Sequence, residues 1–344
     1  MNPIEITQLS RSYGRVDAVR GLDLAVPEGS ICALVGPNGA GKTTTLRVLA
    51  GLLDPSKGSA CILGVDTRRL GVGERRRIGF LDERQQQPDW MTVRQLLDYC
   101  APLYPAWDKG LEVELLRRFE LPGDRKLSQL SRGMRMKALL ISVTAFRPEI
   151  LLLDEPFSGF DPVVRDDVSR GLLDVAQEGN CTVLLSSHDI EEVERVADRL
   201  VMLELGRKLV DEETASLLAR HRRIEVELYE EYGAAKGTGV EAVEGTPVSA
   251  GPGAGATGGG AGVGTTGLTG LPSAGAWPSH WSRPEDSGDR IEFVDTQYAA
   301  ESCEEACRAR YPEAAVQARP MTLRDIYLHT ARSAALARGK GRAS

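Results

Sequence analysis

One segment decides the fold of this chain: Ile31-Cys32-Ala33-Leu34-Val35-Gly36-Pro37-Asn38-Gly39-Ala40-Gly41-Lys42-Thr43-Thr44. Its leading apolar run predicts a central strand that is buried on both faces of a sheet. A glycine-rich loop of the pattern G-x-x-x-x-G-K-[ST] follows at once, and residues 44–53 are predicted to form a helix. Glycines allow backbone N–H groups to approach a phosphate at the N-terminus of such a helix. The segment therefore predicts a nucleotide-binding loop.

The loop residues have separate expected roles in holding a nucleotide. The residues expected to surround the phosphates are Gly36, Pro37, Asn38, Gly39, Ala40, Gly41, Lys42, Thr43 and Thr44. Among them, Lys42 is expected to reach the β- and γ-phosphates. The hydroxyl of Thr43 is expected to ligate the Mg²⁺ ion that accompanies the nucleotide.

Two adjacent acids follow a second apolar run, Ile150–Leu153, where ligands meet the carboxyl edge of a parallel sheet. Asp154 is expected to orient Mg²⁺, and Glu155 is expected to be the general base that polarises an attacking water. Strands often end in solvated acids, so the pattern alone carries little weight. The nucleotide-binding loop upstream is what gives these two acids their predicted roles.

The segment Leu130-Ser131-Arg132-Gly133-Met134-Arg135 lies between these two motifs. Ser131 is predicted to stand near the N-cap of a helix, where its hydroxyl, Gly133 and the helix N-terminus form a second anion site. A capped helix start without a ligand is the alternative. Because the chain's own loop already holds the phosphates, the γ-phosphate at this second site must belong to a partner.

Two single residues complete the candidate site. His188 follows the apolar run of residues 182–186 and is expected to hydrogen-bond the γ-phosphate. Tyr13 lies in a predicted turn upstream of the loop, where it is expected to stack on adenine. A lone histidine at a strand end and a surface aromatic each carry little information by themselves. Both interpretations depend on the positions of these residues relative to the loop.

The apolar pattern divides the chain into three parts. Residues 1–220 are expected to form the nucleotide-binding domain, in which strands alternate with helices around a parallel sheet, with a helical part at about 85–145. Residues 221–232 and 288–335 are expected to form one small α+β module, with two unrelated chain ends as the alternative. Residues 233–287 are expected to be a flexible linker, because a Gly- and Ala-rich stretch buries too little apolar surface to fold.

Composition and charge exclude several classes of protein. The chain has 344 residues, of which 42% are hydrophobic and 26% charged, as in ordinary soluble proteins. A net charge of −7 argues against binding nucleic acid. No apolar run approaches the roughly 20 residues that span a bilayer, and Met1–Glu5 lacks the layout of a signal peptide. The cytoplasm is the expected compartment.

Taken in order, these motifs resemble those of the ATP-binding subunits of ABC transporters, over about residues 1–230. The resemblance implies an α/β P-loop NTPase fold of ABC type, with a parallel-sheet core, an antiparallel β subdomain and an α-helical subdomain. It implies ATP as the nucleotide, and Lys42, Glu155 and His188 as the catalytic residues. It identifies Ser158-Gly159-Phe160-Asp161 as the D-loop. It also implies that two such subunits, here a homodimer, drive a separate transmembrane permease.

Three segments resemble a narrower group, the single-domain ATPases of bacterial ABC-2-type exporters. They are Tyr104–Asp108, Ser131–Met134 and the closing helix at Met321–Leu328. Antibiotic efflux and multidrug efflux are common roles in that group. The resemblance therefore implies an ABC-2-type permease as partner and a peripheral position at the cytoplasmic face of the cell membrane. Substrate specificity in this family resides in the membrane subunit, so this chain leaves the substrate open.

The match departs from the family pattern at two places. Glu83 stands where the family has the Q-loop glutamine, and as a carboxylate it is expected to ligate Mg²⁺. Arg132 and Met134 replace the common glycine and glutamine. Arg132 is expected either to help hold phosphate or to point to solvent.

Two other functions are compatible with a nucleotide-binding loop. One is a soluble ABC-type ATPase in DNA repair, translation or cofactor assembly. The other is a monomeric P-loop kinase or GTPase, which would leave Leu130–Gly133 without a role.

Overall fold

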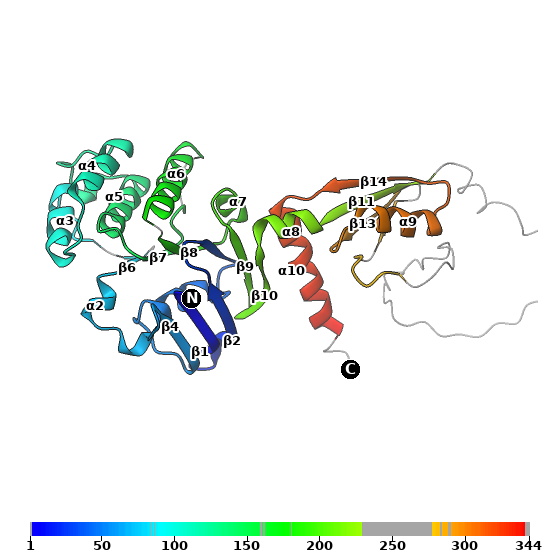
Figure 1. Ribbon diagram of the computed structural model, residues 1–344, viewed down its shortest axis with the longest axis horizontal. Helices are drawn as coiled ribbons and strands as arrows, with labels where there is room; N and C mark the ends of the chain where they lie inside the picture. Colours follow the sequence, from blue (N-terminus) through cyan, green and yellow to red (C-terminus); the bar gives the residue numbers. More distant parts are fainter. Residues whose placement is uncertain are drawn as a thin grey trace, which may run out of the picture. The chain divides into compact units, whose positions relative to one another are not determined.

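The computed structural model describes residues 2–82, 84–85, 87–158, 160, 162–179, 181–228, 277–282, 284–287 and 290–340. These residues separate into two compact units (Figure 1). The first unit comprises residues 1–218 and 322–344, and the second comprises residues 219–321.

A six-stranded sheet forms the centre of the first unit, with the strand order β10-β9-β3-β8-β7-β6. The bounds are β10 (Arg207–Glu213), β9 (Arg199–Glu204), β3 (Ile31–Val35), β8 (Thr182–Ser187), β7 (Ile150–Asp154) and β6 (Ile78–Leu81). The strands from β9 to β6 are parallel, and β10 is antiparallel to β9. Every residue of β3, β7 and β8 is buried, as expected for strands covered on both faces. The predicted parallel core is confirmed.

A second, antiparallel sheet lies on one side of this core, with the order β2-β1-β4-β5. Its bounds are β1 (Ile4–Tyr13), β2 (Val16–Val26), β4 (Lys57–Ile62) and β5 (Val65–Asp66), followed by a 3₁₀ turn (Thr67–Arg69) and α2 (Val72–Arg75). The apolar core lies between the two sheets and includes Leu9, Leu46, Leu152 and Leu184. Leu46 belongs to α1 (Lys42–Leu49), which begins two residues earlier than predicted.

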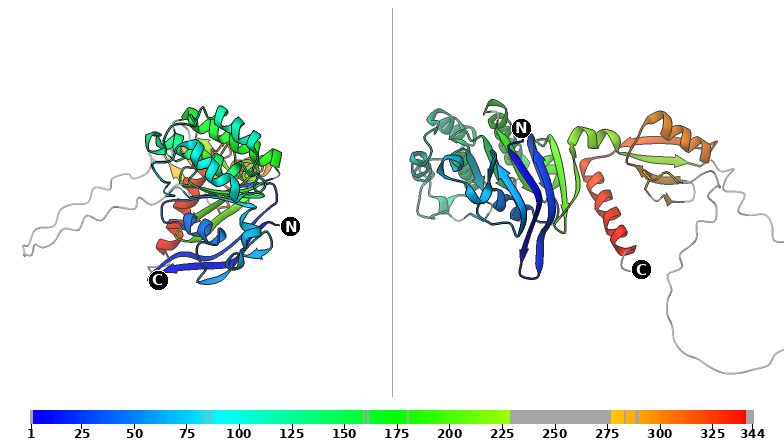
Figure 2. Two further views of the ribbon diagram at one scale, coloured as in Figure 1. Left: turned by 90° about the vertical axis from the view of Figure 1, so that its left-hand side faces the viewer. Right: turned by 60° about the horizontal axis from the view of Figure 1, so that its bottom comes forward.

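Helices cover the opposite side of the six-stranded sheet (Figures 1 and 2). They are α3 (Val93–Cys100), α4 (Lys109–Arg118), α5 (Arg132–Thr144), α6 (Pro162–Gly179) and the short α7 (Ile190–Val193), with 3₁₀ turns at Ala101–Leu103 and Leu127–Gln129. Four of these helices begin with an N-cap side chain that accepts a hydrogen bond from a backbone N–H of the first turn: Thr92, Asp108, Ser131 and Asp189. The predicted N-cap at Ser131 is confirmed.

The second unit is a four-stranded antiparallel sheet in the order β12-β13-β11-β14, with helix α9. Its bounds are β11 (Arg222–Glu227), β12 (Glu285–Asp286), β13 (Arg290–Asp295), α9 (Ala300–Arg310) and β14 (Ala315–Pro320), and α8 (Thr214–Arg220) precedes it. Its core contains Ile224, Trp281, Phe293 and Cys307. Within the residues that the structure describes, no group of three or more potential ligands is arranged to hold a metal ion.

The boundaries of the C-terminal module differ from the expected ones. Trp277 and Trp281 were expected in the linker but belong to the second unit, where Trp281 is only 5% exposed and its ring packs on Phe293. The closing helix α10 (Leu323–Lys340) belongs to the first unit, where Arg324 pairs with Glu191 beside α7. The remaining part of the expected linker, residues 233–276, lies outside the described residues.

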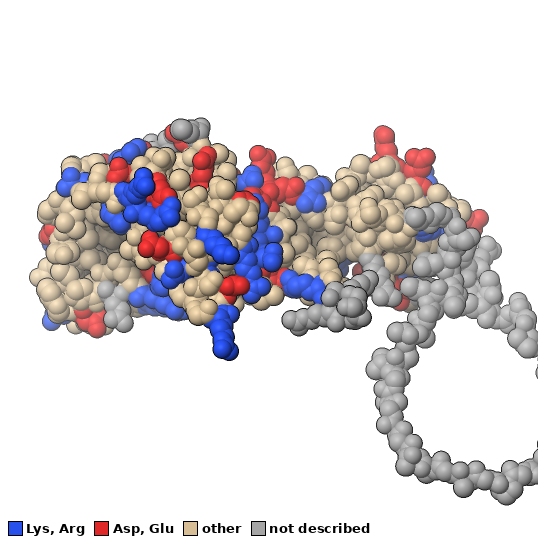
Figure 3. All heavy atoms as spheres, turned by 90° about the horizontal axis from the view of Figure 1, so that it is seen from below, with Lys and Arg blue, Asp and Glu red and all other residues tan. Residues whose placement is uncertain are grey.

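Charge is unevenly spread over the surface of the first unit. Among the charged side chains of this unit, Lys and Arg predominate over Asp and Glu on the face seen in Figure 3. Several exposed arginines are nonetheless paired with acids, including Arg68 with Asp66 and Arg77 with Glu149. Among the described helices, none is long and apolar enough to cross a membrane.

Candidate nucleotide-binding site

The glycine-rich loop connects the end of β3 to the start of α1, as predicted. Two of its glycines are required by the fold. A Cβ atom at Gly36 would lie 2.2 Å from the carbonyl oxygen of Leu203. Gly41, the N-cap of α1, has a left-handed backbone with φ of 105°, and a Cβ atom there would lie 2.6 Å from the carbonyl oxygen of Ala18. The loop can therefore approach its neighbours, and a phosphate, only without side chains at these positions.

Lys42 is turned back into the loop. Its side chain is only 5% exposed, and Nζ donates a hydrogen bond to the carbonyl oxygen of Gly36 at 2.7 Å. Nζ also lies 3.3 Å from Oε1 of Glu155, with which it forms an ion pair. The loop lysine and the expected general base are thus in direct contact.

Asp154 and Thr43 meet as the sequence predicts. The Thr43 hydroxyl donates to Oδ1 of Asp154 at 3.1 Å, and the Ser186 hydroxyl donates to the same oxygen at 2.6 Å. Asp154 is 3% exposed, and this burial raises its pKa above the ordinary value, against the lowering effect of the two hydrogen bonds. A carboxylate and a hydroxyl at one point are oxygen donors of the kind that Mg²⁺ prefers.

Glu155 lies between two basic groups. Its Oε2 accepts a hydrogen bond from the backbone N–H of His188 at 3.2 Å and lies 2.7 Å from His188 Nδ1. Its Oε1 faces Lys42. The backbone of Glu155 is left-handed, with φ of 51°, which is costly for a residue with a side chain and is typical of functional sites. The strand order explains why Glu155, Lys42 and His188 lie together. Strand β8 lies between β3 and β7, so the residues at its end emerge at the same edge of the sheet as the loop after β3 and the acids after β7.

The segment predicted to form a second anion site lies at the start of α5. The Ser131 hydroxyl accepts a hydrogen bond from the Met134 N–H at 3.2 Å. Gly133 faces the ring of Phe160, where a Cβ atom would lie 3.1 Å from Cδ1. The helix N-terminus at Ser131 therefore has the local geometry that was predicted for it.

The remaining predicted residues stand apart from this cluster or outside the described structure. Tyr13 ends β1 and is 47% exposed, and the guanidinium carbon of Arg11 lies 5.0 Å from the centre of its ring. Glu83 lies outside the described residues. Its neighbour Asp82 pairs with Arg47 of α1 at 2.7 Å.

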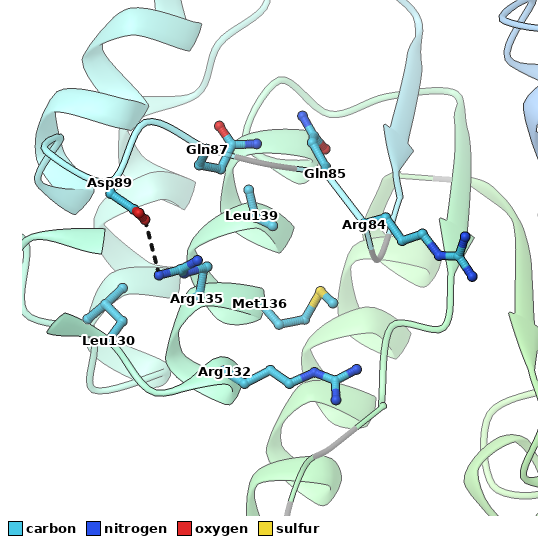
Figure 4. A pocket seen from close by; sticks show the side chains of 9 residues that line it. All are labelled: Arg84, Gln85, Gln87, Asp89, Leu130, Arg132, Arg135, Met136 and Leu139. Carbon is cyan, nitrogen blue, oxygen red and sulfur yellow. Dashed lines mark hydrogen bonds and ion pairs between the residues drawn. The ribbon is translucent and has the colours of Figure 1, made fainter. Parts of the chain in front are cut away.

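A groove of about 630 Å³ opens beside the start of α5 (Figure 4). We call it the α5 groove, and it is lined by Arg84, Gln85, Gln87, Asp89, Leu130, Arg132, Arg135, Met136 and Leu139. Arg135 spans part of it, donating to the carbonyl oxygen of Leu127 at 2.9 Å and approaching Asp89 at 3.4 Å. Basic and amide side chains therefore predominate among its polar groups.

Sequence reasoning missed one residue of the site, Ser186, and one contact, that of Arg132 with Ser158. Ser186 holds Asp154 and also accepts the backbone N–H of Glu155 at 3.1 Å. Its position two residues before His188 could have predicted this role, because both residues lie at the end of the same predicted strand. Arg132 donates to the hydroxyl of Ser158 at 3.0 Å, a partner that no local pattern indicated.

Comparison with known proteins matches this part of the chain. A family model described as "ABC transporter" matches residues 19–158, which include the loop, the start of α5 and the Asp154-Glu155 pair. The chain is 36% identical over 209 residues to the sulfate/thiosulfate import ATP-binding protein CysA of Synechococcus elongatus, covering 59% of this chain and 60% of that protein. This chain therefore spans only about three fifths of the length of that relative.

Two relatives from Bacillus subtilis are covered more fully. The ABC transporter ATP-binding protein YtrB is 32% identical, with 58% of this chain and 68% of that protein covered. The uncharacterized ABC transporter ATP-binding protein YhaQ is 36% identical, with 60% of this chain and 70% of that protein covered.

Solved structures match the same region. An ATP-binding subunit of an ABC transporter superposes with a TM-score of 0.57 and 26% identity, covering 63% of this chain and 92% of that one. The dimeric structure of the bacterial cassette MJ0796 superposes with a TM-score of 0.56 and 24% identity, covering 61% and 98%. The likeness thus covers nearly the whole of those chains but under two thirds of this one.

Proposed function

This chain belongs to the family of ABC transporter ATP-binding proteins and has their nucleotide-binding fold, and we propose that it binds ATP with Mg²⁺ and hydrolyses it. The observation that carries the proposal is the meeting of Lys42, Glu155 and His188 at one edge of the parallel sheet. Thr43 and Asp154 fit a magnesium ion, because a hydroxyl and a carboxylate converge there. When bound, Mg²⁺ would neutralise charge on the phosphate oxygens.

The contacts of Glu155 support its role as general base. The carboxylate of Glu155 is engaged by Lys42 and His188. A γ-phosphate carries more negative charge than a carboxylate and would attract the Lys42 ammonium group to itself. Glu155 would then be free to polarise a water, while the His188 ring, 48% exposed, would turn to the γ-phosphate.

The start of α5 supports dimer formation as part of the chemistry. Ser131 and the helix N-terminus form an anion site that the chain's own loop does not need. We therefore propose that two copies close around two ATP molecules, each copy completing the site of the other. The likeness to a dimeric cassette supports this arrangement.

We further propose that the dimer drives a separate transmembrane permease of ABC-2 type and supports export, as in antibiotic or multidrug efflux. The segments Tyr104–Asp108, Ser131–Met134 and Met321–Leu328 support this assignment, since they resemble exporter ATPases. The chain would then work at the cytoplasmic face of the cell membrane. No nucleic-acid partner is proposed, and the transporter names of the relatives do not favour a soluble ABC ATPase of repair or translation.

Import is the second candidate for the direction of transport. It is favoured by the similarity to sulfate/thiosulfate import ATP-binding proteins, at 36% identity. In export the substrate leaves the cytoplasmic side of the membrane, and in import it leaves the opposite side.

The full chain, purified together with its membrane partner from detergent-solubilised membranes, tests these proposals. Hydrolysis of ATP and recovery of a multi-spanning protein support an ATP-driven transporter, and recovery only with ribosomes or DNA contradicts it. In inside-out vesicles, ATP-dependent accumulation of a substrate indicates export. ATP-dependent accumulation only in right-side-out vesicles, with ATP enclosed, indicates import.

A further inference from the structure

Arg132 places a long side chain with a guanidinium group within the Ser131–Met134 segment. It is the first residue of α5. Its Nη2 donates a hydrogen bond to Oγ of Ser158 at 3.0 Å, and Ser158 is buried. The contact joins the start of α5 to the segment that follows β7.

Ser158 belongs to the turn that begins at Glu155. The backbone N–H of Ser158 donates to the carbonyl oxygen of Glu155 at 3.2 Å, which closes the turn. Glu155 itself has the costly left-handed backbone, and such a conformation persists only where the surroundings hold it. The hydrogen bond from Arg132 to Ser158 therefore restrains the backbone turn that begins at Glu155, the proposed base.

A second contact joins the same two segments. Phe160 is buried, its N–H donates to the carbonyl oxygen of Phe157 at 3.3 Å, and its ring faces Gly133. The polar contact of Arg132 with Ser158 and the apolar contact of Gly133 with Phe160 therefore both join the start of α5 to the segment that follows β7.

Arg132 also lines the α5 groove, and Figure 4 shows its side chain extending from α5 on the side opposite to Asp89. The side chain of Arg132 therefore forms part of the wall of the α5 groove and also contacts the turn that carries Glu155. Anything that shifts Arg132 within the groove would change the restraint on that turn.

We propose that Arg132 is a positioning residue for Glu155: through Ser158 it holds the turn Glu155–Ser158 in the conformation used for ATP hydrolysis. This inference rests on the proposed ATPase function and adds a residue to it. It assigns Arg132 to the turn of its own chain instead of to the partner's γ-phosphate, because Nη2 already donates to Ser158.

The test compares Arg132→Ala, Ser158→Ala and the double variant in steady-state ATP hydrolysis. Each single change should lower kcat about three- to tenfold, the range that corresponds to one ordinary hydrogen bond, because the contact acts on Glu155 only through the turn. KM for ATP should stay within about twofold. The double variant should be no slower than the slower single variant, because both changes remove the same contact. Arg132→Lys, which keeps a donor on a long side chain, should recover part of kcat.

Other results would overturn the inference. Additive losses in the double variant mean that the two side chains act separately. A raised KM in Arg132→Ala with normal Ser158→Ala kinetics means that Arg132 binds phosphate. Arg117→Ala removes an exposed arginine of α4 and serves as the matched control, with unchanged kinetics.

Amide hydrogen exchange separates this inference from the proposed function. In Arg132→Ala without nucleotide, the Ser158 amide should exchange faster, while the amides of β7 keep their protection. If the parent chain hydrolyses no ATP, the proposed function fails, and the exchange result still decides whether Arg132 holds the turn. Unchanged exchange at Ser158 would contradict the inference whatever the activity.

Discussion

The ammonium group of Lys42 lies 3.3 Å from the carboxylate of Glu155, although one residue begins α1 and the other follows β7. Both side chains are buried. A buried ion pair that loses one partner leaves an uncompensated charge, which is strongly destabilising. The pair therefore holds the proposed base in place, and we expect the γ-phosphate of a bound ATP to replace the carboxylate as the partner of Lys42.

Replacing Lys42 by Ala should weaken ATP binding about 10- to 100-fold, the range for loss of a hydrogen bond from a charged group. Isothermal titration of the purified chain with Mg-ATP measures this. Lys57→Ala, on the exposed start of β4, is the control and should bind normally. Unchanged affinity in Lys42→Ala would remove Lys42 from the site.

Replacing Glu155 by Gln should lower hydrolysis about 10²- to 10⁴-fold, the contribution typical of a general base, while ATP binding persists. The variant should accumulate as an ATP-bound dimer, which gel filtration with and without ATP detects. Glu149→Gln changes an exposed carboxylate paired with Arg77 and should hydrolyse at the parent rate. Parental hydrolysis by Glu155→Gln would mean that another group activates the water.

The pH dependence of stability should report on Asp154. Burial raises its pKa above the ordinary value of 3.8, so between that pH and the folded pKa the folded chain holds a proton that the unfolded chain has already lost. Stability therefore falls as the pH rises from about 3.8 through the folded pKa, and Asp154 costs stability above that range.

The Asp154→Asn variant should accordingly melt at a higher temperature than the parent at neutral pH without nucleotide. The difference between the two should shrink as the pH falls toward 4. Mg-ATP should stabilise the parent more than the variant, because only the parent keeps the carboxylate. A melting difference that is independent of pH would show that Asp154 is not the group responsible.

Replacing Gly41 by Ala should destabilise the first unit more than replacing Gly39 by Ala. Both glycines have left-handed backbones, which cost about 1–2 kcal/mol for other residues. A Cβ atom at Gly41 also meets the carbonyl oxygen of Ala18 at 2.6 Å, whereas nothing lies within 4 Å of one at Gly39. Urea unfolding without nucleotide compares the two variants, and equal losses would contradict the close approach at Ala18.

Replacing Trp281 by Ala should destabilise the second unit by about 3–5 kcal/mol, as expected for a large buried aromatic. Its ring packs on Phe293 at 4.3 Å between centroids, and its Nε1 donates to Asp295 at 3.1 Å. Hydrogen exchange should show lost protection in β11 and β13 with little change in β3 and β7. Trp90→Ala, at an exposed position, should leave both units unchanged.

Local patterns predicted the elements that depend on neighbours in sequence. The apolar runs predicted that β3, β7 and β8 are buried on both faces, and Ser131 predicted the N-cap of α5. The module boundary was predicted wrongly, because Trp277 and Trp281 follow a glycine-rich stretch and their burial depends on β13. The assignment of α10 to the C-terminal module was also wrong, because its contact with Glu191 joins distant parts of the chain.

By itself, the sequence determined the nucleotide-binding loop, the acids after β7 and the N-cap at the start of α5, because each is specified by residues within one turn or strand. Only the tertiary structure decided that Glu155 faces Lys42 and His188, and that Arg132 holds Ser158. These contacts depend on the strand order, in which β8 separates β3 from β7. Strand order is set by packing among all the strands and helices of the core, and no short segment encodes it.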